Sequence, residues 1–443
     1  MNRTTKIWIG IGAYLLLGAA PDAMHTPDRG ARDDAAHDLL PIGPATPAFA
    51  AGGEGGEGGE GGEGGGVLSS YKLNLADESA LRYDARPQIE TYAKVVHATY
   101  RAAHDAAVRM KARIDAFLAK PSAETLAEAR FAWINARVPY MQTEVFRFYD
   151  GPIDVADPET GAPGPEGRIN AWPLNEGFID YTKGNARGGI VNDRRVPITR
   201  AALLERDQVT DEADVTTGWH AIEFLLWGQD LSPTGPGNRP ASDYLPGKAA
   251  NDRRRRYLRV VTDLLVDDLG ALAAAWEPGR PDNYAARFVA LDQREALGRM
   301  LAGMATLAGF ELASERIAVG LDSGDQEDEH SCFSDTTRND HIYNLRGIRN
   351  VYFGAYGDTA GAGLDRLVES VDPALNARIV GLLNRAEAAL IAIEHPYDRV
   401  LASPKGSVER RTAEAAAEAL RELAEGFKEA GRKLGVLVVV ASE

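Results

Sequence analysis

The sequence contains one cysteine, Cys332, among 443 residues. An intramolecular disulfide and a metal site built on two or more cysteines are therefore excluded, so histidine, aspartate and glutamate remain as metal ligands. The 8 histidines make a short set to search. The HExxH, GxSxG and glycine-rich phosphate-binding motifs are all missing. The sequence thus gives no support to the common zinc-protease, serine-hydrolase or nucleotide-binding functions.

Positive charge is also scarce, with 49 lysines and arginines against 65 aspartates and glutamates, a net charge of 49 − 65 = −16. Nucleic acid and anionic membrane surfaces would repel such a chain, so we expect no nucleic-acid partner, and the charge favours cations instead. The composition, 44% hydrophobic and 26% charged, is typical of a soluble globular protein long enough for two domains.

The N-terminal residues have the pattern of an export signal. Arg3 and Lys6 precede an apolar run over residues 7–20, which is too short for a comfortable membrane span. We predict a signal peptide over residues 1–25, with an N-terminal core helix as the alternative, and no transmembrane span after cleavage. Residues 26–66 include the repeat AGGEGGEGGEGGEGGG and predict a disordered linker rich in glycine and glutamate.

The rest of the chain predicts an all-α fold of two helical bundles, residues 67–245 and 246–443. Apolar residues recur every three or four positions through 86–120, and alternating strand patterns are nearly absent. Ser122 is the expected N-cap of a second helix, in which Pro139 predicts a kink or a local break. A long irregular loop rich in glycine and proline follows at 150–197.

The two halves have a similar segment, which suggests an internal duplication. When GWHAIEFLLWG (218–228) is aligned with NLRGIRNVYFG (344–354), the final glycines match. Arg346 and Arg349 then stand opposite His220 and Glu223. If the duplication holds, the chemistry was kept in the first copy and replaced by arginines in the second.

His220 and Glu223 are the strongest candidates for chemistry. Three residues apart in a helix, they project from one face and can converge on one ion. Their neighbours are apolar, so the pair is expected to be buried. A buried pair of this kind needs either a metal or a set of hydrogen-bond partners, and spacing alone leaves both open.

Glu144 is the candidate third ligand. We place it on one helix face with Arg137 and Tyr140, where a core stripe should be apolar. The alternative is that Glu144 and Arg137 pair with other helices.

Other charged residues have simpler expected roles. Ser334 and Asp335 are expected to cap the next helix, whereas Asp340 either faces His220 across the domain interface or lies in water. Residues 253–256, four consecutive arginines, predict a solvated helix face. The acidic residues of 322–329 lack the spacing of a calcium loop.

These residues carry a family resemblance that covers residues 70–440. GWHAIEF is a GxHxxE motif, and it occurs with WINARVPYMQTEVFRFYDGPID, INAWPLNEGFIDY and HSCFSDTTRNDHIYNLRGIRNVYFGAYG. In this order the four segments closely resemble the imelysin family of exported bacterial proteins, which includes iron-regulated proteins.

The resemblance implies two helical domains with a site at their interface, in the periplasm or cell envelope, and a role in iron uptake. Gly218, His220 and Glu223 match the motif, and Glu144 fits the acidic ligand of related iron-binding proteins. The family is named for an insulin-cleaving metallopeptidase, but HxxE lacks the second histidine and the general-base glutamate of HExxH. The cysteine that anchors lipoprotein members is also missing here.

We therefore expect an exported metal-binding protein concerned with iron uptake or homeostasis. The predicted ligands are His220, Glu223 and Glu144. The expected ion is a divalent or trivalent metal, with iron and zinc as the first candidates. The expected partner is an envelope iron-transport component. Two alternatives remain, a zinc metallopeptidase that uses the same residues and a helical adaptor with a vestigial site.

Overall fold

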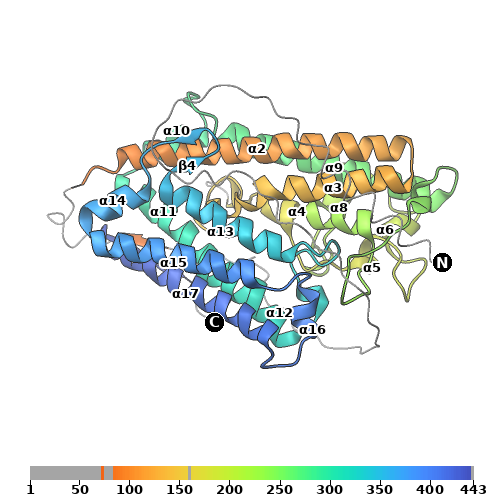
Figure 1. Ribbon diagram of the computed structural model, residues 1–443. Coiled ribbons are helices and arrows are strands. Elements are labelled where there is room, and N and C mark those ends of the chain that lie inside the picture. The colour runs from red at the N-terminus through yellow and green to blue at the C-terminus, as the bar shows by residue number, and fades with distance from the viewer. Residues whose placement is uncertain (1–70, 74–82, 158–160, 441–443) are drawn as a thin grey trace, which may run out of the picture. The chain divides into compact units, whose positions relative to one another are not determined.

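The computed structural model describes residues 71–73, 83–157 and 161–440, and these residues confirm the all-α prediction (Figure 1). The predicted signal peptide and linker lie outside them. The long helices are α2 (Arg86–Ala119), α3 (Ala123–Met141), α9 (Ala249–Ala275), α11 (Gln293–Thr306), α13 (Thr337–Phe353), α15 (Pro373–Ala392) and α17 (Val408–Lys433). In the described part of the chain, no helix combines the length and the apolar character needed to cross a bilayer.

Shorter helices fill the connections between the long ones. They are α4 (Glu166–Asn170), α5 (Glu176–Ile179), α6 (Gly189–Asn192), α7 (Arg200–Leu204), α8 (Gly218–Trp227), α10 (Tyr284–Val289), α12 (Val319–Ser323), α14 (Leu364–Val371) and α16 (Asp398–Ala402). Tighter 3₁₀ turns occur at η2 (Glu144–Phe146), η3 (Ala241–Tyr244) and η5 (Gln326–Asp328), and the wider π-helix η4 (Leu307–Ala318) joins α11 to α12.

The strands are short and form three antiparallel pairs. The first pair is β1 (Tyr71–Leu73) with β6 (Val436–Val438), in which Tyr71 faces Val438. The others are β2 (Val155–Asp157) with β3 (Ala162–Pro163) and β4 (Ala355–Tyr356) with β5 (Thr359–Ala360).

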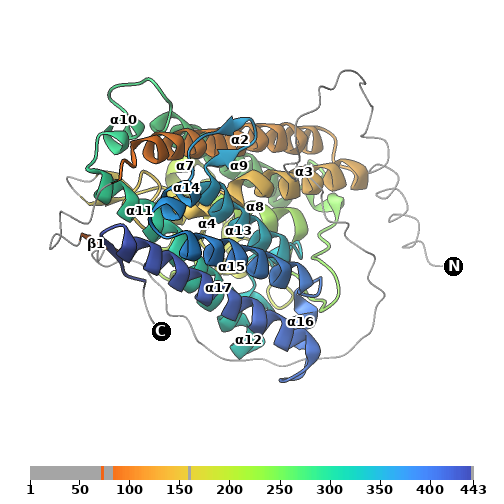
Figure 2. The same cartoon turned by 60° about the vertical axis from the view of Figure 1, so that its left-hand side comes forward.

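The helices pack both against their neighbours in sequence and against helices that are distant in sequence. Helix α2 lies along α3 and α9, and α17 lies along α15 and η4 (Figure 1). Helix α13 contacts α3, η4 and α15 and so joins these groups, as the turned view also shows (Figure 2). The domain boundary near 245 and the internal duplication stay predictions.

Local signals explain where the site-bearing helices begin and end. Ser122 caps α3 as predicted, because its side chain accepts from the Thr125 amide while Thr125 accepts from the Ser122 amide. Pro139 lies inside α3, which continues past it and ends at Met141. The placement of Glu144 on this helix is therefore wrong, because it lies in the turn η2.

Two of the four arginines at 253–256 differ from the prediction of a solvated helix face, whereas Arg256 is exposed. Arg254 is only 2% exposed and its guanidinium donates to both carboxylate oxygens of Asp180, at 2.5 and 3.1 Å. Arg253 donates to four backbone carbonyls between Ile190 and Val196. These two arginines hold the irregular region of the first half against α9 rather than facing water.

Candidate metal centre

Helix α8 carries the HxxE pair through the interior of the protein. All ten of its residues are buried. It begins at Gly218, whose φ is +82°, and a Cβ at this position would lie 2.4 Å from the Ile169 carbonyl oxygen. The glycine of the motif therefore lets the start of α8 approach the backbone of α4 and adopt a conformation that other residues avoid.

Replacing Gly218 with alanine should destabilise the fold. The left-handed backbone alone costs about 1–2 kcal/mol for an alanine, and the clash with Ile169 adds to it because backbone atoms must move. Urea unfolding of Gly218→Ala should show a loss of about 2 kcal/mol or more. Gly381→Ala is the matched control, since a Cβ at Gly381 of α15 meets nothing within 4 Å and should stabilise its helix slightly. Equal stability of the two variants would contradict this explanation of the glycine.

His220 and Glu223 meet as the spacing predicts. The Nδ1 atom of His220 lies 2.9 Å from Oε2 of Glu223. The other carboxylate oxygen, Oε1, accepts from the Ser334 amide at 2.9 Å and from its hydroxyl at 2.6 Å. Both side chains are buried. Through these hydrogen bonds, the loop before α13 orients the Glu223 carboxylate, and the carboxylate orients the His220 imidazole.

The outer nitrogen of this imidazole has no partner. His220 is 2% exposed, and no hydrogen bond reaches its Nε2 atom. Burial, together with the nearby Arg137 charge, holds the pKa of His220 well below its usual range, so the ring is neutral. In the tautomer whose Nδ1–H donates to an ionised Glu223, the lone pair of Nε2 is available, which is the state in which histidine binds metals.

Burial raises the pKa of Glu223 to about 8, against the lowering effect of Ser334. A cation placed beside the pair would favour the charged carboxylate. The centre thus has an unused nitrogen ligand and an acid whose ionisation a metal would promote.

A second network surrounds Asp340, which is buried rather than exposed to water. Its Oδ2 accepts from Arg137 at 2.6 Å and from Ser331 at 2.6 Å, and it lies 2.9 Å from Nδ1 of His330. The His330 ring packs edge-on against the His220 ring, with centroids 4.8 Å apart. Asp340 therefore reaches the HxxE pair through His330.

Arg137 is held on several sides. It also donates to Oδ1 of Asn170 at 2.6 Å. Its guanidinium lies over three aromatic rings, 5.4 Å from Trp133 and 5.6 Å each from Tyr140 and Trp219. The two predicted neighbours, Arg137 and Tyr140, thus pack together against Trp219 of α8.

Glu144 belongs to a different set of contacts. Its Oε2 accepts from Arg316 at 2.7 Å, and Arg147 lies 3.5 Å away. Burial would raise the pKa of Glu144, but the charges of Arg316 and Arg147 lower it, so the acid is ionised. Its hydrogen bonds join it to these arginines and to the Tyr140 hydroxyl, and not to His220 or Glu223. Its role as a third ligand stays a prediction.

Sequence reasoning missed two partners of the pair, Ser334 and His330. Ser334 was expected to cap a helix, but α13 begins after Thr336, and the Ser334 side chain reaches Glu223 instead. Both residues lie in the loop between η5 and α13, where sequence periodicity gives no information. The signals that could have found them were the close spacing of polar residues in HSCFSDTT and the presence of this segment among those that carry the family resemblance.

The structure also brings together a separate group of buried acids. Among the described residues, one set of three histidine, cysteine or carboxylate ligand atoms lies within 4.8 Å of one another, and Asp230, Asp335 and Asp398 supply it. The sequence did not single out these residues as ligands.

Comparison with known proteins points in the same direction as the motif. The sequence model of the family described as Imelysin (Peptidase_M75) matches residues 96–426. Iron-regulated protein A of Synechococcus elongatus is 28% identical over 342 residues, which cover 75% of this chain and 82% of the relative.

Solved structures share the fold. A protein from Parabacteroides distasonis, described as an iron-regulated protein A precursor, superposes with a TM-score of 0.62 at 20% identity, covering 81% of this chain and 98% of the other. An imelysin-like protein from Psychrobacter arcticum gives a TM-score of 0.57 at 14% identity, covering 81% and 99%. At these identities the likeness shows the fold alone.

Proposed function

The chain belongs to the imelysin family, and we propose that it is an exported metal-binding protein that takes part in iron uptake or homeostasis. The iron-regulated name of its relative in Synechococcus elongatus supports the connection with iron. The precursor description of the Parabacteroides distasonis structure supports export, together with the signal pattern of residues 1–25. The location would be the periplasm or cell envelope, with an iron-transport component as partner.

The observation that carries the proposal is the unpartnered Nε2 atom of His220. A buried polar nitrogen without a hydrogen bond is costly, and native proteins rarely retain one without a use. The ring is neutral and its Nδ1 atom is fixed by Glu223. In metal sites, a carboxylate on the far nitrogen orients the imidazole and increases its basicity.

In this proposal His220 binds the ion through Nε2, and Glu223 holds the ring or shares the ion. Glu144 would join as the third ligand only by exchanging its contact with Arg316 for the metal. Imidazole with carboxylates suits iron and zinc. The bound metal would supply a charge centre that the carboxylates balance, and the chain's own residues orient the histidine and exclude water.

Metal titration of the purified protein tests the proposal. Iron(II), iron(III) and zinc should each be added to protein stripped by a chelator, with bound metal measured after desalting. We expect one equivalent of iron or zinc at the His220 centre. A peptide-cleavage assay on the same loaded samples separates a binding protein from a metallopeptidase, because only the latter would show metal-dependent turnover.

Ser334→Ala should weaken this metal binding without abolishing it. The variant removes the hydroxyl that holds Oε1 of Glu223 but leaves His220 and the backbone amide in place. Loss of such an orienting group usually costs about 10- to 100-fold in metal affinity. Ser370→Ala is the control, since Ser370 is exposed and bonds only to the Leu367 carbonyl of its own helix. Identical metal affinities of the two variants would show that Ser334 does not support the site.

A further inference from the structure

We propose that Asp230, Asp335 and Asp398, with Glu329 beside them, form a second cation site that takes a hard, oxygen-preferring divalent ion of the calcium, magnesium and manganese class. This site shares no ligand with the His220 centre. It joins segments that are distant in sequence, namely the chain after α8, the loop before α13 and the first residue of α16.

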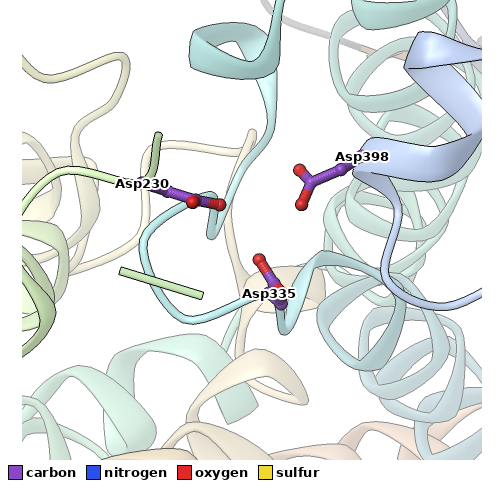
Figure 3. Close-up of side chains that lie close together, drawn as sticks. All are labelled: Asp230, Asp335 and Asp398. Carbon is purple, nitrogen blue, oxygen red and sulfur yellow. The ribbon is translucent and has the colours of Figure 1, made fainter. Parts of the chain in front are cut away.

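The three aspartate carboxylates converge. One ligand atom from each of the three aspartates lies within 4.8 Å of the others. Figure 3 shows the three carboxylates pointing toward one another. Carboxylate oxygens from three separate segments are the ligand type and the arrangement that hard cations prefer, and the absence of nitrogen and sulfur ligands distinguishes this site from the His220 centre.

Asp398 points into this cluster and has no ordinary hydrogen-bond donor. It is 2% exposed, and no backbone amide, alcohol or cationic side chain of the described residues donates to its carboxylate oxygens. Its side-chain neighbours are the carboxyl groups of Glu329 and Asp335. Asp335 is 5% exposed, and its Oδ1 atom likewise lacks a partner. Asp230 is better satisfied, because it accepts from the Ser232 amide at 2.9 Å and from the side chain of Gln326.

The side chains of this cluster are acids without a neighbouring counter-charge among the described residues. Glu329 is 2% exposed and lies against Asp398, so four buried acids share one region. The strongest charge interactions on these acids come from one another, and no arginine or lysine of the described residues forms an ion pair with them. Burial and mutual repulsion raise the pKa of Asp230, Asp335 and Glu329 to about 8 and that of Asp398 to about 11.

A cation removes this conflict. Without one, ionising the cluster places like charges together in the interior, which is strongly unfavourable. With one, the divalent charge offsets two of the negative charges, and the three segments are tied together. Since Ser334 directly precedes Asp335, the cation would also fix the loop that holds Glu223.

Calcium titration of chelator-stripped full-length protein tests the proposal, with magnesium and manganese as parallel arms. Thermal unfolding should show a midpoint that rises by several degrees with at least one of these ions, because a ligand that binds only the folded state stabilises it. The rise should vanish in Asp398→Asn and in Asp335→Asn.

Two controls separate this site from the other one. Asp322→Asn changes an exposed acid and should keep the full rise. His220→Gln should keep it as well, so failure of the His220 proposal leaves this result unaffected. The proposal is overturned if none of the three ions raises the midpoint of the wild type, or if the rise persists in both aspartate variants.

Discussion

Replacing His220 with glutamine is expected to abolish stoichiometric iron or zinc binding at the proposed centre. Glutamine has a similar length and can still hydrogen-bond to Glu223, so α8 should keep its packing. What is lost is the imidazole Nε2 lone pair, which has no hydrogen-bond partner in the structure. Because even an orienting residue is worth about 10- to 100-fold in metal affinity, loss of the ligand itself should exceed about 100-fold.

The measurement is metal content after desalting, followed by calorimetric titration. His104→Gln is the matched control, because the His104 side chain is 31% exposed and its nearest charged partner is Asp105 on the helix surface. Circular dichroism and the unfolding midpoint verify that both variants fold. If His220→Gln binds metal as the wild type does, the ion lies elsewhere, and the pair is a hydrogen-bonded core element.

Replacing Arg316 with methionine should lower the free energy of unfolding by more than any other substitution proposed here. Arg316 is 1% exposed, and it donates to Glu144 at 2.7 Å and to Glu311 at 2.6 Å. Without it, Arg147 at 3.5 Å is the remaining cation beside the fully buried Glu144, and Tyr140 is a neutral donor. Removing one partner of a buried ion pair costs about 3–5 kcal/mol, because the other charge is left uncompensated.

The double variant Arg316→Met/Glu144→Gln is the control for this effect. It removes both charges, so much of the lost free energy of unfolding should return. Urea unfolding of the wild type, both single variants and the double variant measures the coupling between the two residues. Exposed ion pairs contribute about 1 kcal/mol or less. If Arg316→Met loses less than that in free energy of unfolding, the pair does not stabilise the fold.

The pH dependence of the same variants has a definite sign. In the wild type the pKa of Glu144 is lowered, so its ion pair contributes stability above the pKa of an unfolded glutamate and loses it as pH falls through the folded value. In Arg316→Met the acid can instead protonate at low pH. The stability difference between wild type and variant should therefore be larger at neutral pH than near pH 4.

The sequence predicted much of the fold because helices leave a local signal. The apolar period through 86–120 corresponds to α2, and the cap at Ser122 lies where the sequence placed it. The pairing of His220 with Glu223 was also predictable, since residues three apart on a helix face the same way.

The rest of the site depends on contacts between distant segments. Ser334 reaches Glu223 from a loop, and Arg316 reaches Glu144 from η4, and neither contact has a local pattern. Pro139 predicted a break but not the turn that follows, which takes Glu144 away from the helix face where it was expected. The aspartate cluster was invisible for the same reason, because its members come from three separate connections.

The most direct test is an anomalous difference map from crystals of the full-length protein loaded with iron or zinc. The proposed function predicts a peak at bonding distance from Nε2 of His220. A peak found only among Asp230, Asp335 and Asp398, or no peak at either place, would contradict it.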